Sequence, residues 1–191
     1  MITQKNKRLF LAIPLPEADC KQLSALPEQV PLTHARWTKQ NNLHITTYFF
    51  GAQPEPMLTT IISDLTELLA QEKTFLLPYR HLSWAPPSQQ EKNMLWAEYG
   101  ATNNFKLLGQ MLEKELKKYQ KIKQEKTHLE LIPHVTLARF KHCDQHEKII
   151  LPQLKLPDLE LSSLILMESQ LLPDGPEYFP LATFTLSCNA A

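Results

Sequence analysis

Hydrophobic and polar positions follow two different periods along this chain, and these periods predict both strands and helices. Short apolar or alternating runs predict strands over residues 8–15, 44–50, 75–84, 94–99, 134–140, 161–171 and 180–187. Apolar residues at helical spacing predict helices over 55–72 and 103–119, and a shorter helix runs from Pro16 to about Pro27. Gly51 is expected to end the second strand, and residues 36–39 form a short extended piece.

The predicted elements come in a similar order in the two halves of the chain. Residues 8–84 and 94–187 each run strand, helix, strand, and residues 85–88 (APPS) mark the boundary between them. Phe10 precedes His44 by 34 positions, and Trp96 precedes His134 by 38. We therefore expect one domain over residues 1–191, built as an approximate duplication of 8–84 and 94–187.

Composition limits the classes of protein to which the chain can belong. At 191 residues and 43% hydrophobic, it can bury a core without disulfides or metal. Lys plus Arg and Asp plus Glu both number 20, so any polyanion has to be held by a local patch of charge. Three scattered cysteines form no disulfide framework, and the apolar run 9–15 is too short to span a membrane. A reduced, cytoplasmic location is expected.

Two segments repeat a His-x-Thr pattern within extended apolar runs: LHIT at 43–46 and PHVT at 133–136, ninety residues apart. In each segment the two side chains leave the same face of a strand, because side-chain direction alternates with a period of two. Two residues of strand span roughly 6–7 Å, which lets an imidazole and a hydroxyl reach around one phosphate. The repeat indicates a duplicated half-site, with His44 and His134 acting from opposite sides of one substrate.

Alternation also predicts which neighbours face the same way as these histidines. One face is expected to carry His44, Thr46 and Tyr48, and the other Ile45, Thr47 and Phe49. The same rule places Arg139 on the face opposite His134 unless the strand bends.

These residue types suit the opening of a phosphodiester. In-line attack at phosphorus needs a base for the nucleophile and an acid for the departing oxygen, and imidazole can serve as either near neutral pH. The hydroxyls of Thr46 and Thr136 can stabilise the charge that develops on the non-bridging oxygens. The arrangement requires no metal and no cofactor.

At these residues the chain resembles the 2H phosphoesterase superfamily, named for its two His-x-Thr motifs. More closely, it resembles the bacterial and archaeal RNA 2′,3′-cyclic phosphodiesterases, also called 2′-5′ RNA ligases. The resemblance extends over four blocks: residues 8–16 (RLFLAIPLP), 36–51, 133–139 (PHVTLAR) and 166–184. The fourth position of the first motif is Thr47, where members of the family often carry an apolar residue. The Thr47 side chain is expected to face away from the cleft.

The resemblance implies a bilobal α+β fold, with two pseudo-symmetric lobes that each hold an antiparallel sheet and packed helices, and an active cleft between them. It implies hydrolysis of a 2′,3′-cyclic phosphate at an RNA end to a 2′-phosphomonoester. In that reaction His44 would donate a proton to the 3′ oxygen and His134 would accept one from water. Thr46 and Thr136 would hold phosphate oxygens.

Four further residues are candidates for substrate binding. Arg139 could neutralise phosphate, and Phe10, Trp37 and Tyr178 could stack on a nucleobase. The expected partner is an RNA with a cyclic phosphate end or a small cyclic nucleotide, bound by a monomer away from any membrane. Two alternatives stay open: the same site joining tRNA halves through a 2′-5′ linkage, and a non-catalytic RNA-binding module.

Overall fold

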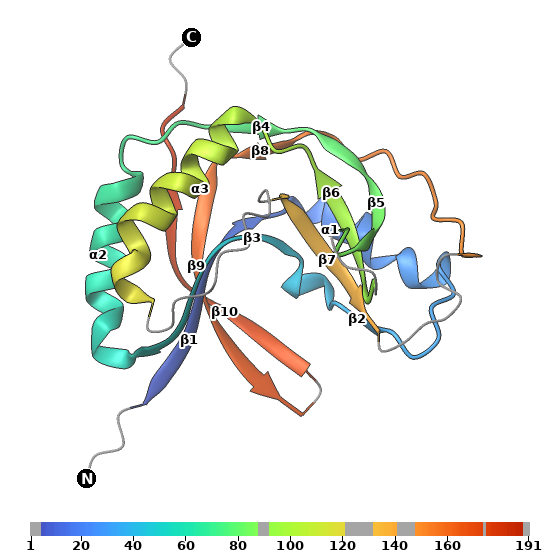
Figure 1. Cartoon of the computed structure of the whole chain (residues 1–191), viewed down its shortest axis with the longest axis horizontal. Coiled ribbons are helices and arrows are strands. Elements are labelled where there is room, and N and C mark those ends of the chain that lie inside the picture. Colours follow the sequence, from blue (N-terminus) through green and yellow to red (C-terminus); the bar gives the residue numbers. More distant parts are fainter. Residues whose placement is uncertain (1–4, 88–91, 121–131, 141–147, 174, 189–191) are drawn as a thin grey trace.

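The computed structural model of this protein describes residues 5–87, 92–120, 132–140, 148–173 and 175–188 (Figure 1). Within these ranges, eight strands form one sheet in the order β10-β9-β1-β3-β7-β6-β5, with β2 added beside β7. They are β1 (Asn6–Pro14), β2 (Arg36–Trp37), β3 (His44–Pro54), β5 (Tyr79–Ala85), β6 (Met94–Tyr99), β7 (His134–Arg139), β9 (Ser163–Leu172) and β10 (Gly175–Thr185). A second sheet pairs β4 (Phe75–Leu77) with β8 (Leu159–Leu161).

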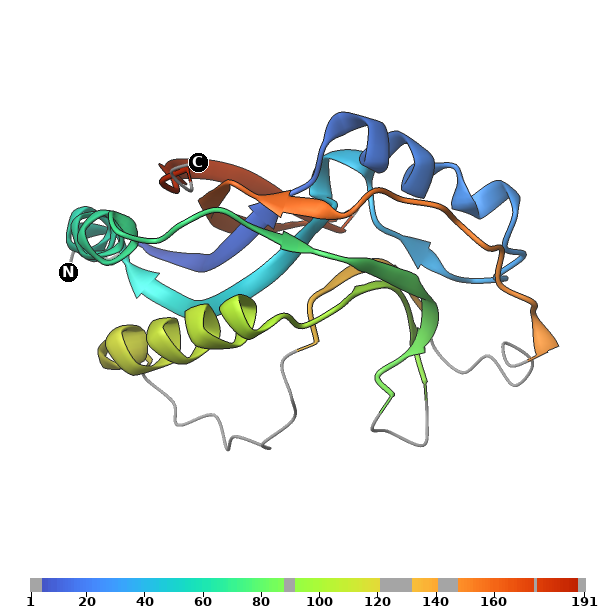
Figure 2. The same ribbon diagram turned by 90° about the horizontal axis from the view of Figure 1, so that it is seen from above.

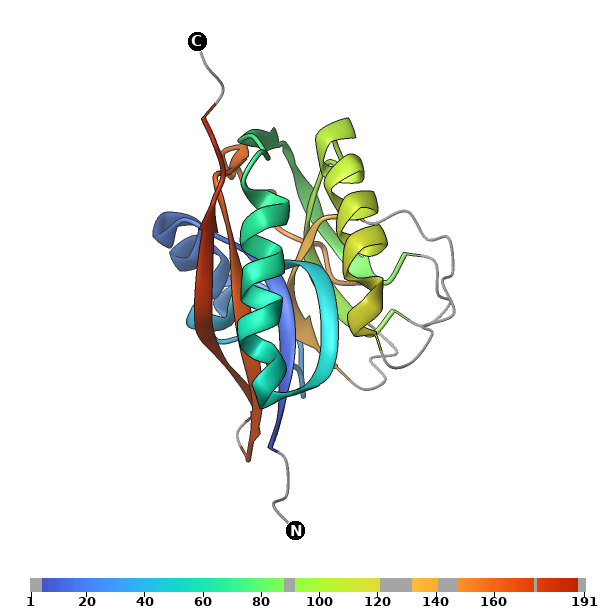
Figure 3. The ribbon, with the colours of Figure 1, turned by 90° about the vertical axis from the view of Figure 1, so that its left-hand side faces the viewer.

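The helices cover the core through regularly spaced apolar residues. They are α1 (Glu17–Ser24), α2 (Leu58–Leu69) and α3 (Asn103–Leu116), and short 3-10 turns occupy Leu26–Glu28, Gln40–Asn42, Glu55–Met57 and Lys117–Tyr119. In α2, Ile61, Leu65 and Leu69 recur every four residues and are all buried. Thr102 begins α3 by accepting a hydrogen bond from the Phe105 amide. Figure 3 shows α2 and α3 side by side, and Figure 2 shows α1 at the other end of the molecule.

The α+β class is confirmed, and several predicted boundaries are wrong; the strand expected over 180–187, for example, is β10, which runs from Gly175 to Thr185. Strand β3 continues past Gly51 to Pro54, because Gly51 adopts a φ of 71° and stays paired with Leu9. The strand expected over 75–84 is two strands, of which β4 pairs with β8 and β5 pairs with β6. The helix expected up to Pro27 ends at Ser24 and is followed by a 3-10 turn.

One residue pair joins the two halves of the large sheet. Strands β3 and β7 pair through Ile45 and Val135 alone, and both side chains are completely buried. A separate sheet was expected in each half of the molecule, whereas all described strands except β4 and β8 belong to one sheet, in which the two motif strands pair with each other. The order is symmetric about this junction, with β1 beside β3 as β6 is beside β7. The duplication stays a prediction, which this symmetry supports.

A β-bulge follows the threonine of each motif. The pairing of β1 with β3 skips Thr47, and the pairing of β6 with β7 skips Leu137. An extra residue reverses the alternation beyond it. Tyr48 is therefore buried in the core and Phe49 is 58% exposed, so the predicted faces of these two side chains are wrong. The bulge at Leu137 likewise places Arg139 on the same side of β7 as His134.

Candidate active site

His44 begins β3 and has both of its ring nitrogens engaged. Its Nδ1 lies 2.7 Å from the carbonyl oxygen of Asn42, and its Nε2 lies 3.0 Å from the Thr46 hydroxyl. The carbonyl can only accept, so Nδ1 carries a hydrogen and Nε2 is the nitrogen that could exchange a proton with a ligand. The buried side chain of Asn42 donates to the Pro176 carbonyl at 2.8 Å, which ties this support to β10.

His134 begins β7 in the same way. Its Nδ1 lies 2.8 Å from the carbonyl oxygen of Ile132, again two residues earlier in the chain. The ring stacks on Trp96 with centroids 3.6 Å apart and an angle of 13° between the planes. The carbonyl and the indole together fix the orientation of the imidazole and leave its Nε2 for proton exchange.

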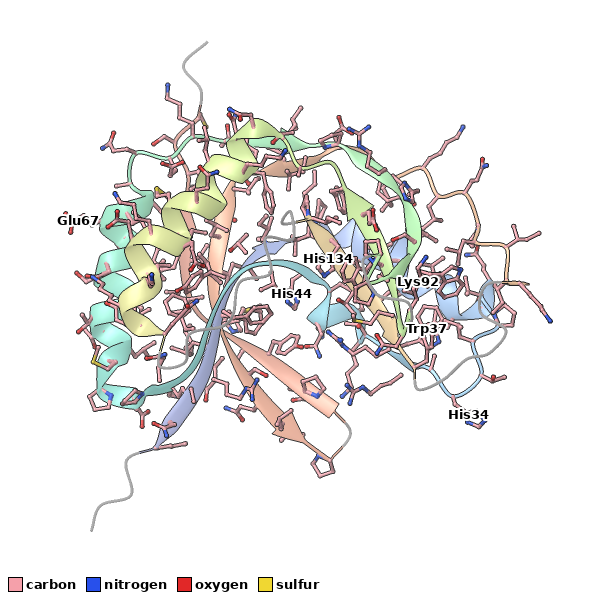
Figure 4. The ribbon with its side chains drawn as sticks, viewed as in Figure 1. His34, Trp37, His44, Glu67, Lys92 and His134 are labelled. Carbon is pink, nitrogen blue, oxygen red and sulfur yellow. The ribbon has the colours of Figure 1, made fainter. Side chains whose placement is uncertain are left out.

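The junction of β3 and β7 brings the two motifs together. In an antiparallel pair centred on Ile45 and Val135, the flanking positions place His44 toward Thr136 and Thr46 toward His134. All four of these side chains are partly exposed, whereas the two central side chains are buried. Figure 4 shows the two imidazoles as neighbours, and the charge of His134 lowers the pKa of His44. The predicted histidines and threonines therefore line one face of the sheet.

Burial is the main influence on both imidazoles. It lowers the pKa of His44, whereas the Asn42 carbonyl raises that pKa. It also lowers the pKa of His134, which the Ile132 carbonyl and Glu98 raise and Arg139 lowers. Both rings therefore favour the neutral form when the site is empty. An anionic phosphate between them would favour protonation of one ring, which creates an acid beside a base.

Aromatic side chains lie against each histidine. Phe10 and Tyr178 were predicted to bind substrate, and their ring centroids lie 4.9 and 5.2 Å from that of His44. Trp37 comes from β2, is half-buried and packs against the hydrophobic core. Figure 4 shows it apart from both histidines, so the structure does not bring this candidate to the site.

Three residues near the histidines were missed from the sequence. Trp96 stacks on His134 and Phe10 lies against His44, although Trp96 pairs with Thr136 whereas Phe10 pairs with Phe49; the similar spacings of 38 and 34 residues were the available signal. Glu98 is the direct cross-strand partner of His134, which only the pairing of β6 with β7 reveals. The ring centroid of Phe49 lies 6.3 Å from that of Phe10. Strict alternation predicts the opposite face for Phe49, because it takes no account of the bulge at Thr47.

A cavity of about 310 Å³ adjoins His44. Ala12, Ile165 and Met167 supply an apolar wall from the sheet, and the side chains of Gln40 and Asn41 add amide groups. Such a mixture suits an organic group with polar edges, and the volume lies at the lower end of small-molecule sites. On the His134 side, the indole of Trp96 stacks on one face of the imidazole.

Two features of the described residues concern metal binding and membrane spanning. Among them, no group of three His, Cys, Asp or Glu side chains lies close enough together to hold a metal ion. None of the described helices is both long enough and apolar enough to cross a bilayer.

The sheet centred on a duplicated His-Thr pair defines a two-histidine phosphoesterase architecture. A family model of the 2′-5′ RNA ligase superfamily matches residues 15–165, and the chain belongs to this superfamily. An RNA 2′,3′-cyclic phosphodiesterase of Methanocaldococcus jannaschii is 29% identical over 90% of this chain and 96% of its own. One of Thermotoga maritima is 26% identical over 90% and 91%.

Solved structures show the same fold. TT0787 of Thermus thermophilus superposes with a TM-score of 0.78 at 25% identity, covering 94% of this chain and 97% of its own. LigT of Escherichia coli in complex with 3′-AMP superposes with a TM-score of 0.77 at 19% identity, covering 96% and 99%.

Proposed function

We propose that this protein hydrolyses 2′,3′-cyclic phosphates, at RNA ends or in small cyclic nucleotides, to 2′-phosphomonoesters. The observation that carries the proposal is the pair of neighbouring imidazoles, each with Nδ1 bound to a backbone carbonyl and Nε2 left for proton exchange. The names of the relatives from M. jannaschii and T. maritima support the same reaction.

The residues divide the reaction between two proton transfers. His134 takes a proton from water as the water oxygen bonds to phosphorus, and His44 gives a proton to the 3′ oxygen as its bond to phosphorus breaks. Each transfer contributes roughly 10²–10⁴ in rate. The hydroxyls of Thr46 and Thr136 bind the non-bridging oxygens, whose negative charge grows in the transition state.

The surroundings of the two rings support this division of roles. The departing 3′ oxygen belongs to a nucleoside, which needs room, and the cavity adjoins His44. Water needs little room, and Trp96 covers one side of the His134 ring. We therefore assign the nucleoside to the His44 side and the attacking water to the His134 side.

Product analysis tests the proposal directly. Purified protein is incubated with the 2′,3′-cyclic phosphates of the four nucleosides in excess chelator, and chromatography distinguishes 2′- from 3′-phosphate products. His44→Ala and His134→Ala should each lower kcat by at least about 10², the lower end expected for one acid or base. The exposed His34, which has a φ of 59°, supplies the control His34→Asn, because Asn tolerates this conformation. Full turnover by both alanine variants would refute the assignment.

The superfamily name favours one second activity, the joining of RNA ends through a 2′-5′ linkage by the same site. It is tested by supplying an RNA with a cyclic phosphate end together with an RNA that has a 5′-hydroxyl. A linked product that disappears in His44→Ala supports joining, and its absence at high RNA concentration leaves hydrolysis as the activity.

A further inference from the structure

The β9–β10 hairpin meets the segment that supports His44. Asn42 ends the 3-10 turn Gln40–Asn42, and its side-chain amide donates to the carbonyl oxygen of Pro176 on β10 at 2.8 Å. The backbone carbonyl of the same residue accepts the hydrogen bond from Nδ1 of His44 at 2.7 Å. Asn42 therefore holds the hairpin with its side chain and the imidazole with its backbone.

The bond between Asn42 and Pro176 is shielded from solvent, since only 8% of the Asn42 surface is exposed. A second contact between the same two segments joins Lys39 to Glu177 at 3.3 Å, but these side chains are 56% and 40% exposed. Water screens an exposed ion pair, whereas a shielded hydrogen bond leaves an unsatisfied acceptor when its donor is removed. The amide is therefore the stronger connection between the hairpin and the turn.

The hairpin also contacts His44 directly. Tyr178 follows Pro176 by two residues on β10, and its ring meets the imidazole edge-on, with centroids 5.2 Å apart and an angle of 88° between the planes. Figure 1 shows the hairpin projecting beyond the rest of the sheet. An element that projects in this way needs contacts with the body of the protein to keep its position, and the Asn42 amide supplies one of them.

The two halves of the site hold their supporting carbonyls by different means. Before His134, Ile132 has only a hydrocarbon side chain, and the next residue, Pro133, accepts a backbone hydrogen bond from the Tyr99 amide at 2.9 Å. That segment continues the pairing of β6 with β7. Before His44 the carbonyl belongs to a short 3-10 turn, a structure whose own hydrogen bonds have poorer geometry. Loss of the side-chain bond at this turn should therefore affect one histidine and not the other.

His44 depends on this support because an acid must present its proton in a fixed direction. It reaches the departing oxygen only when Nε2 points at that oxygen, and a misplacement of about 1 Å can cost about 10² in rate. The Asn42 carbonyl also raises the pKa of His44, so it favours the protonated ring that an acid needs. Rotation of this carbonyl would disturb both properties.

We propose that Asn42 is a positioning residue for general acid catalysis, which transmits the place of the β9–β10 hairpin to the imidazole of His44 through its own carbonyl. The inference rests on the proposed function, because it takes His44 as the acid for the departing 3′ oxygen. It makes the hairpin part of the acid half of the site and leaves the base half independent of it.

A change of leaving group separates this role from a structural one. The substrate is uridine 2′,3′-cyclic phosphate, and its partner is the analogue in which sulfur replaces the 3′ oxygen. A thiolate departs without the proton that an alkoxide needs, because thiols are much stronger acids than alcohols. A variant that has lost acid catalysis should therefore recover its activity, relative to the wild type, on the sulfur substrate.

Asn42→Leu removes the amide and keeps a side chain of similar size. We expect its kcat/KM for the oxygen substrate to fall by about tenfold or more, and by less than that of His44→Ala, because the imidazole remains. On the sulfur substrate most of this loss should disappear for Asn42→Leu and His44→Ala, but not for His134→Ala. Asn42→Ala is a second variant, which leaves room for water to satisfy the Pro176 carbonyl.

Gln53→Leu is the matched control. Gln53 is a buried amide at the other end of β3, where it donates to the carbonyl oxygens of Phe50 and Tyr119 at 2.7 and 2.8 Å. Its loss leaves unsatisfied acceptors as the loss of the Asn42 amide does, but far along the strand from His44. The ratio of sulfur to oxygen kcat/KM should stay at the wild-type value. Because each ratio is taken within one preparation, any unfolded fraction cancels.

A kcat/KM that falls equally on both substrates in Asn42→Leu and Asn42→Ala, or falls on neither, overturns the inference. So does a recovery on sulfur that Gln53→Leu shows as well. If His44→Ala recovers on the sulfur substrate and the Asn42 variants do not, this inference alone fails. If His134→Ala recovers instead, the acid and the base are exchanged, and the assignment in the proposed function fails with it.

Discussion

Replacing Ile45 with alanine tests whether the junction of β3 and β7 positions the catalytic pair. Ile45 is completely buried, pairs with Val135 and lies between His44 and Thr46 in the sequence. Its side chain therefore contributes both to the stability of the core and to the separation of the two imidazoles. A change here acts on both properties.

The two effects have different magnitudes. Truncating a fully buried isoleucine to alanine costs about 2–5 kcal/mol of the free energy of unfolding. For a chain of this size that corresponds to a fall in melting temperature of about 4–20 °C. A displacement of about 1 Å between reacting groups can cost about 10² in rate. We therefore expect kcat of Ile45→Ala to fall well beyond any loss of folded protein.

Leu166→Ala is the matched control. Leu166 is also completely buried and pairs with Leu11 in the same sheet, away from the junction. Urea titration gives the free energy of unfolding of both variants, and kcat is measured at a temperature where both are fully folded. If the two variants lose stability equally and retain the same kcat, the junction does not position the histidines and the reasoning is wrong.

Three further outcomes are expected. Thr46→Val should lower kcat by about 10², because it removes a hydroxyl 3.0 Å from Nε2 of His44. Thr47→Val should keep the wild-type kcat and lose about 1 kcal/mol of stability, because it removes the hydrogen bond to the Leu11 carbonyl. Equal kcat values for the two variants would contradict this prediction. Burial lowers the pKa of His44 and His134 below 6.5, so below that pH the unfolded chain binds protons that the folded chain does not. Stability should therefore rise with pH up to about 6.5, and urea titrations should show a flatter rise in the double His→Gln variant. Glu98→Gln removes a charge that raises the pKa of His134, so the acidic limb of the kcat/KM profile should move to lower pH; movement to higher pH would exclude His134 as the base.

The local part of the site could be predicted from the sequence. His44 and Thr46 lie two residues apart before any irregularity in β3, so alternation alone places them on one face. The expectation that Thr47 faces away from the cleft is also confirmed, since its hydroxyl is buried and donates to the Leu11 carbonyl at 3.1 Å. Beyond Thr47 the alternation fails, because the bulge depends on how β3 pairs with β1.

What the sequence could not provide is the pairing of strands distant in the chain. The same-face placement of Arg139 depends on a bulge at Leu137, which is visible only in the register of β7 against β6. The nearness of the two motifs depends on the pairing of β3 with β7, and a repeated pattern does not reveal which strands become neighbours. Glu98 was missed for this reason, since only its position across from His134 gives it a role.

The carbonyl bonds to both Nδ1 atoms have a consequence for the catalytic cycle. In the proposed mechanism each imidazole exchanges protons through Nε2 alone, so one turnover leaves the former base charged and the former acid neutral. That distribution of protons suits the return reaction. Before the next forward turnover, solvent must restore the starting state, and the speed of this step sets an upper limit on the forward turnover rate.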